Sequence, residues 1–246
     1  MVKLIILAAG KGSRLMPLTQ KIPKPLIVVE KGKTILDMAL DEIIKSKVVD
    51  EVIYVVGYLA EQIEAKLKTI NKIKTRTIYN PFYEESCDLY SLWFAIKEID
   101  SDVFITNADN IINAKVYKMM QKEKGIVLAV SKSDNLLPDE TKVQIDGDEI
   151  INASKKINGD CLVESVSLLR ITKEKAVLFK EVLDKMVREG NYIDEHWLDI
   201  FYRLYKEGIQ VKPLEVPRGL WDEVDYHGDL VDVMKKYKKM RGKKHG

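Results

Sequence analysis

Several patterns that mark common enzyme classes are absent from this chain of 246 residues. Only two cysteines occur, Cys87 and Cys161, and they lack the spacing of metal ligands. This usage fits a reducing compartment. None of the three histidines has a motif partner, so we find no Ser–His–Asp, Cys–His or zinc arrangement. Any catalysis must therefore depend on other groups.

The chain also lacks an excess of one charge and a long apolar run. It has 40 basic and 38 acidic residues, for a net charge of +2, so no global field points to nucleic acid. The apolar run near the amino terminus breaks at residues 10–12, too short for a signal or membrane segment. We expect a cytoplasmic protein with no membrane insertion. The basic residues 235–245 favour a solvated helix end over an interaction tail.

Neither of the two commonest phosphate-binding loops is present. No Walker motif occurs, and a dinucleotide fingerprint would need a third glycine where the chain has Leu15. What the chain has is a buried-strand pattern at residues 4–7 that opens into a turn with Gly10 and Gly12. Such a turn presents backbone N–H groups to an anion, and Arg14 and Lys24 add positive charge. The pattern predicts a nucleoside triphosphate site with chemistry on its phosphates.

Strand-like and helical segments alternate along the first half of the chain. This alternation predicts an α/β fold with a mixed, mostly parallel sheet flanked by helices, and a smaller mixed substrate-binding region on the same sheet. We expect one domain over 1–246, with a nucleotide-binding half at 1–125 and an acceptor-binding half at 126–246. The expected strands are 4–7, 52–56, 74–79, 103–106, 127–130, 142–145, 163–169 and 211–216, and the expected helices are 35–44, 61–67, 90–99, 115–121, 174–186 and 196–205.

Residues 7–19, Leu-Ala-Ala-Gly-Lys-Gly-Ser-Arg-Leu-Met-Pro-Leu-Thr, with Lys-Pro-Leu at 24–26, are more specific than the glycines alone. This string resembles the nucleotidyltransferases that make nucleotide sugars and related activated alcohols. The resemblance implies a Rossmann-like fold, with Arg14 on the β- and γ-phosphates and Lys24 on the α-phosphate. The nucleotide-binding residues expected with them are Leu7, Ala8, Ala9, Gly10, Gly12, Ser13, Gly57 and Asp88.

Two acidic positions are candidates for a metal site. Asp109 follows the strand at 103–106, where it could hold Mg²⁺ or serve equally well as a helix N-cap. Residues 221–225, Trp-Asp-Glu-Val-Asp, resemble the late Trp-x-Glu-x-Asp segment of the same family, whose last aspartate is a metal ligand. The resemblance implies that Asp109 and Asp225 meet across one Mg²⁺, with Glu223 in support.

Residues 80–93 are similar to a segment of cytidylyltransferases that act on phosphocholine, inositol-1-phosphate and related phosphorylated alcohols. Those enzymes usually have Asn-Asn where this chain has Cys87 and Asp88. Asp88 could accept a hydrogen bond from the cytosine amino group, or it could cap the helix that starts near Tyr90. The aromatic and apolar residues of the segment are expected in the core rather than on the base: Phe82, Tyr90, Leu92 and Trp93.

The second half of the chain should bind the acceptor. The resemblance places Lys142, Lys155 and Glu164 there, with Lys155 as the candidate for its phosphate. Residues 192–197 resemble a Tyr-x-Glu-Asp segment near the acceptor, which adds Tyr192 and Glu195, although an N-cap at Asp194 fits equally well.

The expected reaction joins CTP to a small phosphorylated alcohol with Mg²⁺ as cofactor. Inositol-1-phosphate is the first expected acceptor and phosphocholine the second, since Tyr192, Trp197 and Asp194 could form a cage for a quaternary ammonium. A sugar-1-phosphate enzyme that uses UTP or dTTP is a further alternative. A catalytically inactive subunit is disfavoured because Arg14, Lys24, Asp109 and Asp225 are all present, and a homodimer is left open.

Overall fold

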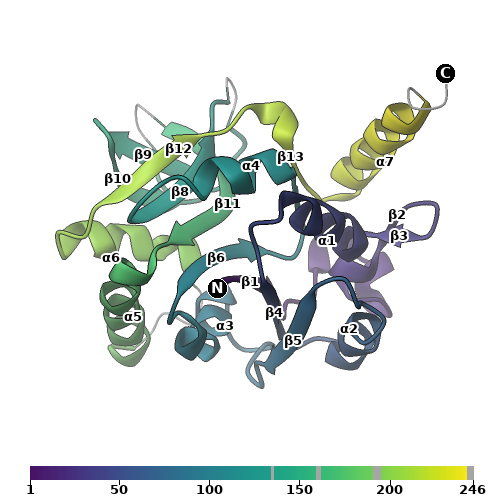
Figure 1. The fold of residues 1–246 in the computed structure, drawn as a ribbon, viewed down its shortest axis with the longest axis horizontal. Helices are drawn as coiled ribbons and strands as arrows, with labels where there is room; N and C mark the ends of the chain where they lie inside the picture. The colour runs from purple at the N-terminus through teal and green to yellow at the C-terminus, as the bar shows by residue number, and fades with distance from the viewer. Residues whose placement is uncertain (134–135, 159–161, 191–194, 243–246) are drawn as a thin grey trace.

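The computed structural model describes residues 1–133, 136–158, 162–190 and 195–242. Within these residues, nine strands form one central sheet with helices on both faces (Figure 1). The sheet strands are β1 (Val2–Ala8), β4 (Glu51–Val56), β5 (Lys74–Tyr79), β6 (Asp102–Asn107), β8 (Ile126–Ser131), β9 (Lys142–Asp146), β10 (Glu149–Ser154), β11 (Leu162–Ile171) and β12 (Val211–Glu215). The helices are α1 (Ile35–Ser46), α2 (Ala60–Leu67), α3 (Asp88–Phe94), α4 (Ala114–Met120), α5 (Lys173–Arg188), α6 (Ile200–Lys206) and α7 (His227–Gly242).

The strand order β5-β4-β1-β6 gives the first half a doubly wound topology. These four strands are parallel, and the chain leaves β1 for β4 on one side and later enters β6 on the other. In such sheets the ligand crevice lies at the carboxyl ends of the strands where the order reverses, here between β1 and β6. The expected α/β fold with a mostly parallel sheet is confirmed.

Strand β11 joins the two halves of the sheet. It runs antiparallel to β6, β8 and β9, and its register shifts between Ser165 and Leu169. Ser167 lies in this shift with φ of 53°, a left-handed conformation that a bulge accommodates. Strand β12 pairs in parallel with β8, so among the described sheet strands β10 and β11 alone run against the direction of β1.

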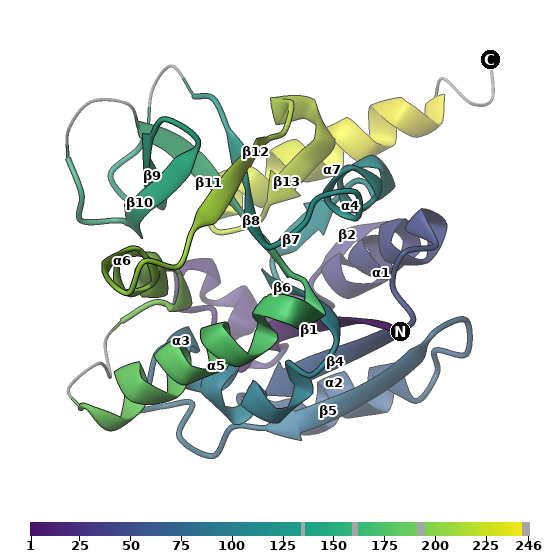
Figure 2. The same ribbon diagram turned by 60° about the vertical axis from the view of Figure 1, so that its left-hand side comes forward.

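Side chains of β1 alternate between two cores. Leu4 and Ile6 pack on the face covered by α1, α2 and α4, whereas Ile5 and Leu7 pack on the face covered by α3, α5 and α6 (Figure 2). This period of two is the pattern of a strand buried on both faces. Helix α1 begins at a capping box in which Thr34 and Asp37 satisfy each other's backbone N–H groups.

Two small ribbons and α7 attach the end of the chain to its beginning. Strand β13 (Trp221–Glu223) pairs antiparallel with β7 (Asn110–Ile112), and β2 (Val28–Glu30) pairs with β3 (Lys33–Thr34). A third apolar cluster joins α7 to the loop after β1 through Leu15, Val224 and Val233. Helix α7 then projects outward, so its far end lies away from the sheet (Figure 1).

The expected helices and strands differ from the observed ones at two helices and at one strand of the central sheet. The helix expected at 90–99 is wrong in its second part, because α3 ends at Phe94 and residues 96–98 form a separate 3₁₀ turn. The helix expected at 196–205 begins with a 3₁₀ turn at Trp197–Asp199 before α6. Strand β10 was not expected. No helix in the described ranges is long and apolar enough to cross a membrane.

Candidate functional site

The loop after β1 is folded tightly onto Lys24. Gly12 has φ of 62°, and a Cβ at this position would lie 3.1 Å from both Lys24 Cβ and Thr19 Cγ2. Thr19 Oγ1 donates to the Gly12 carbonyl oxygen at 2.8 Å, which fixes the turn. Glycine at position 12 therefore allows the loop to bring Arg14 and Lys24 to the end of β1.

The carboxyl ends of β1 and β6 open into a cleft of about 390 Å³, here named the main cleft. Residues expected at the nucleotide and metal site converge on it from distant parts of the sequence. Those that line it are Leu7, Ala8, Ala9, Gly10, Gly12, Ser13, Arg14, Lys24, Asp88, Asp109 and Asp225. Gly57 does not line it. A Cβ there would lie 2.5 Å from Tyr83 Cβ and 3.0 Å from Ala9 Cβ, so Gly57 lets these residues pack closely.

An ion-pair network lies at the centre of the main cleft. Lys24 Nζ lies 2.7 Å from Asp109 Oδ2 and 2.6 Å from Asp225 Oδ1, and Arg14 Nη1 lies 2.7 Å from Asp225 Oδ2. Burial lowers the pKa of Lys24, but the Asp109 and Asp225 carboxylates outweigh it, so the pKa is raised. Burial likewise opposes the ionised form of Asp225, but Lys24 and Arg14 lower its pKa. Lys24 therefore stays protonated and Asp225 ionised.

Three carboxylates in or beside the main cleft could hold a divalent cation. Asp109, Glu223 and Asp225 each offer an oxygen atom, and these atoms lie within 4.8 Å of one another. Asp109 Oδ1 is buried and accepts no hydrogen bond from any described residue. Burial and the charges of Asp109 and Asp225 raise the pKa of Glu223 well above its ordinary value. An orphaned oxygen among crowded carboxylates fits a hard cation such as Mg²⁺.

The ribbon of β7 and β13 explains how these carboxylates meet. Glu223 pairs with Asn110 in the ribbon, and Val224 N donates to the Asp109 carbonyl oxygen at 3.2 Å. The N-cap alternative for Asp109 is wrong, because α4 is capped by Asn113. Asp225 is held in turn by Asp229, whose Oδ2 accepts from Asp225 N at 2.9 Å.

Asp88 has a role that the sequence did not suggest. It is the first residue of α3 and does not cap it, since the N-cap position is Cys87. Its Oδ1 accepts from Trp197 N at 2.8 Å, and its Oδ2 lies 3.5 Å from His196 Nδ1. The Asp88 carboxylate raises the pKa of His196, which also lines the main cleft. Asp88 thus ties the nucleotide half to the segment before α6, and no local motif marked His196.

A smaller pocket of about 200 Å³, here named the side pocket, adjoins the main cleft at Asp225. Lys155 and Glu164 line it as expected, together with Arg218 and Tyr226, which sequence reasoning missed. Its other lining residues are Leu137, Asp139, Glu140, Thr141, Ser165, Ser167, Glu223, Asp225 and Asp229.

Other acceptor candidates lie elsewhere. Lys142 is buried behind the side pocket and donates from Nζ to the Lys155 carbonyl oxygen at 3.1 Å, so it supports Lys155 from behind. Glu195 does not line the side pocket. Tyr192, like Asp194, lies outside the described residues.

Two expectations for aromatic residues are corrected. Trp197 is fully buried and donates from Nε1 to Asn107 Oδ1 at 2.9 Å, so it cannot face a ligand as part of a cage. Phe82 is not in the core: it is 54% exposed, and its ring stacks on Phe94 with centroids 6.1 Å apart. Leu92 is fully buried, as expected.

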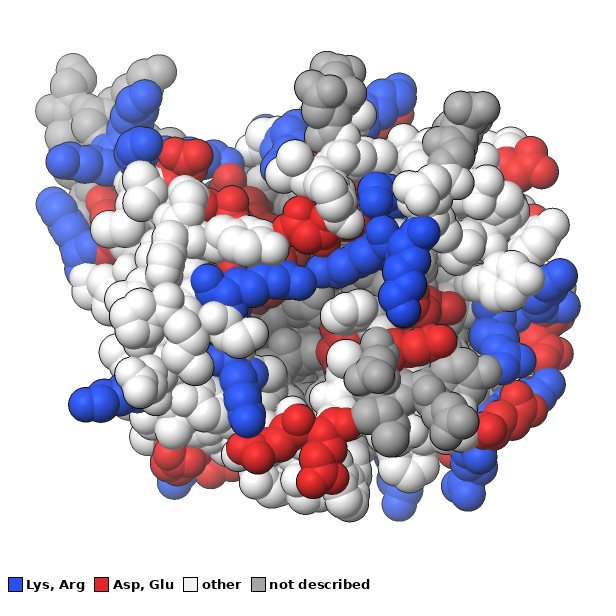
Figure 3. Space-filling model, turned by 180° about the vertical axis from the view of Figure 1, so that it is seen from behind, with Lys and Arg blue, Asp and Glu red and all other residues white. Residues whose placement is uncertain are grey.

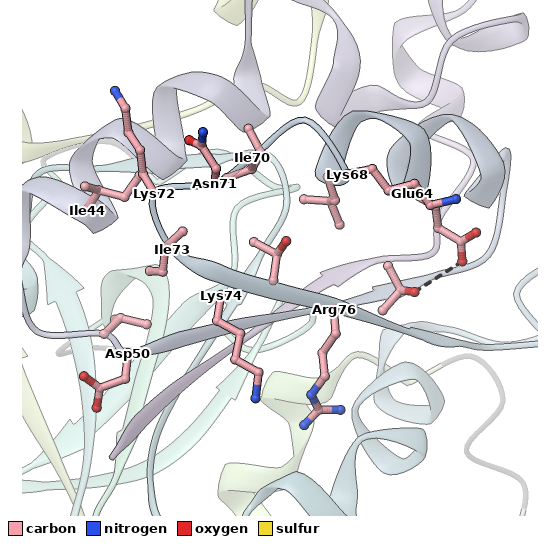
Figure 4. Close-up of a pocket in the computed structure, with 14 residues that line it drawn as sticks. Ile44, Asp50, Glu64, Lys68, Ile70, Asn71, Lys72, Ile73, Lys74 and Arg76 are labelled. Atoms are coloured by element: carbon pink, nitrogen blue, oxygen red, sulfur yellow. Dashed lines mark hydrogen bonds between the residues drawn. The ribbon is translucent and has the colours of Figure 1, made fainter.

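A wider hollow of about 1010 Å³ lies at the amino end of β5, at the opposite edge of the sheet from the carboxyl ends of β1 and β6 (Figure 4). Lys74 and Arg76 reach the same side of the strand there, and both pair with Glu51. Its wall also includes Glu64, which accepts a hydrogen bond from Thr77. Lys74 and Arg76 are thus already paired with a carboxylate. On the face in Figure 3, a row of basic side chains crosses the middle, with acidic side chains above and below it.

Comparisons with known proteins agree with this geometry. A model of the nucleotidyl transferase family matches residues 3–152. A choline-phosphate cytidylyltransferase from Streptococcus pneumoniae is 31% identical over 222 residues, covering 87% of this chain and 90% of that protein. A CTP:phosphoglutamine cytidylyltransferase from Campylobacter jejuni is 28% identical, with coverage of 92% and 96%. The solved inositol-1-phosphate CTP transferase of T. maritima shares the fold, with a TM-score of 0.78, 21% identity and 96% coverage of both chains.

Proposed function

The chain belongs to the nucleotidyl transferase family, and from this premise we propose that it is an Mg²⁺-dependent cytidylyltransferase. It joins CTP to a small phosphorylated alcohol and releases pyrophosphate. The observation that carries the proposal is the convergence of Arg14, Lys24, Asp109 and Asp225 in one cleft at the switch point of the sheet. Retention of all four also argues against an inactive subunit.

The reaction needs no general base. A phosphate monoester is largely dianionic at neutral pH, because its second pKa is about 6. One of its oxygens attacks the α-phosphorus of CTP, a new P–O bond forms, and the bond to the β-phosphate oxygen breaks. Pyrophosphate leaves with the bonding electrons, and no proton moves. Catalysis then consists of positioning and charge neutralisation.

The residues of the main cleft divide this work. Arg14 holds the β- and γ-phosphates as the leaving group forms, and Lys24 neutralises charge on the α-phosphate. Lys24 must exchange its carboxylate partners for the phosphate to do so. When bound to Asp109 and Asp225, with Glu223 beside them, Mg²⁺ would supply positive charge to the phosphate oxygens. Lys155, at the junction with the side pocket, orients the incoming phosphate.

Two acceptors follow from the sequence, inositol-1-phosphate first and phosphocholine second. A solved neighbour of the same fold is an inositol-1-phosphate CTP transferase, and a relative with 31% identity is a choline-phosphate cytidylyltransferase. We propose the two halves, 1–125 and 126–246, as the nucleotide and acceptor parts of one domain. A cytoplasmic location and a homodimer stay predictions.

Pyrophosphate release with purified protein tests the proposal directly. CTP, UTP, dTTP and ATP are compared with a panel of phosphorylated alcohols and sugar-1-phosphates. We expect turnover with CTP and a phosphorylated alcohol. Preference for UTP or dTTP with a sugar-1-phosphate would replace the proposal with the alternative, and no turnover with any pair would refute it.

A further inference from the structure

The side pocket carries more negative than positive charge, and this bears on which acceptor the proposed enzyme takes. Six acidic and two basic side chains line it among the described residues. The acidic residues are Asp139, Glu140, Glu164, Glu223, Asp225 and Asp229, and the basic ones are Lys155 and Arg218. Even with Glu223 and Asp225 assigned to a metal ion, the remaining carboxylates outnumber the cations. A substrate that brings only negative charge is poorly matched to such a pocket.

The charges are also ordered along the side pocket. Lys155 acts electrostatically on Glu223 and Asp225, so it belongs to the end that opens into the main cleft. Glu164 lies instead beside Arg218, whose Nε is 3.8 Å from its carboxylate, and the charge of Glu140 adds to the effect of burial in raising its pKa. An acceptor whose phosphate is held near Lys155 therefore directs the rest of the molecule toward Glu164.

Glu164 is a buried carboxylate without a donor of its own. Its side chain is 5% exposed, and it accepts no hydrogen bond from a described residue. The nearest cation is Arg218, whose Nε lies 3.8 Å away and whose guanidinium lies over the Trp221 ring, 4.2 Å from its centre. Burial raises the pKa of Glu164 to about 7. A carboxylate with so little exposure is costly to keep ionised unless a cation lies beside it.

We propose that the acceptor carries a cationic nitrogen, and that the Glu164 carboxylate binds this nitrogen with Glu140 beside it. The class comprises phosphorylated amino alcohols and aminoalkyl phosphonates, with a primary or a quaternary nitrogen. A neutral polyol such as inositol could donate hydroxyl hydrogens but would leave the excess negative charge uncompensated. The nitrogen stays protonated or fully alkylated, so the phosphate or phosphonate oxygen remains the nucleophile and the balance of the reaction is unchanged.

The inference rests on the proposed function, and its test measures acceptor preference. We compare kcat/KM with CTP for phosphoethanolamine, 2-aminoethylphosphonate and phosphocholine against glycerol-3-phosphate and inositol-1-phosphate. Acceptors with a primary nitrogen should be preferred by about 10- to 100-fold, the factor expected for a charge-assisted hydrogen bond. Phosphocholine has no N–H to donate, so its preference should come from charge alone and be smaller. The comparison of phosphoethanolamine and 2-aminoethylphosphonate with phosphocholine shows whether a primary or a quaternary nitrogen fits the side pocket better.

Variants assign the preference to Glu164. Glu164→Gln should lower kcat/KM for cationic acceptors by the same factor, and should lower it less for the neutral acceptors. Glu140 is less buried than Glu164, so Glu140→Gln can be tested even if Glu164→Gln fails to fold. Glu140→Gln should also reduce the preference for cationic acceptors. Glu149→Gln, on neighbouring β10 and outside the side pocket, is the matched control and should keep the wild-type preference.

Two results would overturn the inference and leave the proposed function intact. One is turnover of neutral acceptors as efficient as that of cationic ones. The other is an equal loss for both classes in Glu164→Gln and in Glu140→Gln. Absence of turnover with every acceptor, together with absence of CTP binding, would instead refute the proposed function itself.

Discussion

Removal of the Lys24 ammonium should weaken catalysis while it strengthens metal binding to the nucleotide-free protein. In the structure this ammonium lies between Asp109 and Asp225, at 2.7 and 2.6 Å from their oxygens. A divalent cation that binds both carboxylates must displace it. Lys24→Met keeps the length and the apolar stem of the side chain and removes the competing charge. The two effects should therefore have opposite signs.

The size of each effect can be bounded. A hydrogen bond to a charged group contributes about 1.5–3 kcal/mol, and Lys24 makes two that metal binding would break. Part of this is recovered when the ammonium is hydrated, so a net gain of at least about 1.4 kcal/mol, or tenfold in metal Kd, is a cautious figure. Turnover should fall by about 10² to 10³, the usual effect of losing one donor to the transition state.

The assay measures Mn²⁺ binding to nucleotide-free protein by electron paramagnetic resonance, beside pyrophosphate release at saturating CTP. Lys21→Met, an exposed lysine on the same loop, is the matched control and should change neither quantity. Unchanged or weaker Mn²⁺ binding in Lys24→Met would show that the ammonium does not compete for the carboxylates, and the reasoning would fail. Full turnover in Lys24→Met would remove Lys24 from the catalytic assignment.

Three further outcomes are expected. Asp109→Asn should lower turnover at least about 100-fold because it removes a metal ligand, and retained pyrophosphate release would contradict that role. Asp229→Ala should raise the Mg²⁺ concentration needed for half-maximal rate, because Asp229 holds Asp225 N, whereas Asp229→Asn keeps an acceptor and should retain the wild-type value. The pKa of Glu164 is raised from 4.5 to about 7 in the folded protein. Between pH 4.5 and pH 7 the folded protein therefore holds a proton that the unfolded chain has released, so the free energy of unfolding falls as pH rises through this range. In urea denaturation at pH 8, the free energy of unfolding of Glu164→Gln should therefore exceed that of the wild type by up to about 3 kcal/mol. The difference should narrow toward pH 4.5, and a difference that stays constant with pH would contradict the prediction.

The sequence predicted the tight glycine turn after β1 well because its determinants are local. Gly12, Thr19 and Lys24 contact one another within a short stretch of chain, so the residue types and their spacing carry the structure. The strands of the first half were equally clear, since each is an apolar run between helical segments. The helix expected through Ile99 was wrong because apolar spacing continued past Phe94, where the backbone changes to a 3₁₀ turn.

The parts that the sequence did not predict depend on contacts between distant segments. Asp88 and His196 are far apart in the chain, and nothing around either residue indicates that they meet. The meeting of Asp109 with Asp225 was expected only through resemblance, and its physical cause is the ribbon of β7 and β13. Arg218 escaped notice because a lone arginine near a turn has no pattern of its own.

Together with the proposed function, the ion pairs of the main cleft predict that nucleotide and metal bind as a unit. In the structure the cations Arg14 and Lys24 are paired with Asp109 and Asp225. CTP alone must break these pairs to reach the cations, and Mg²⁺ alone must displace Lys24 to reach the carboxylates. A complex of the two satisfies both signs of charge in one exchange, because the phosphates receive the cations as the metal receives the carboxylates. Each ligand therefore lowers the cost of binding the other, and this coupling is reciprocal. Lys24→Met should reduce the coupling between nucleotide and metal binding. In this variant no ammonium has to be displaced from the carboxylates, so the metal can bind them without the phosphates.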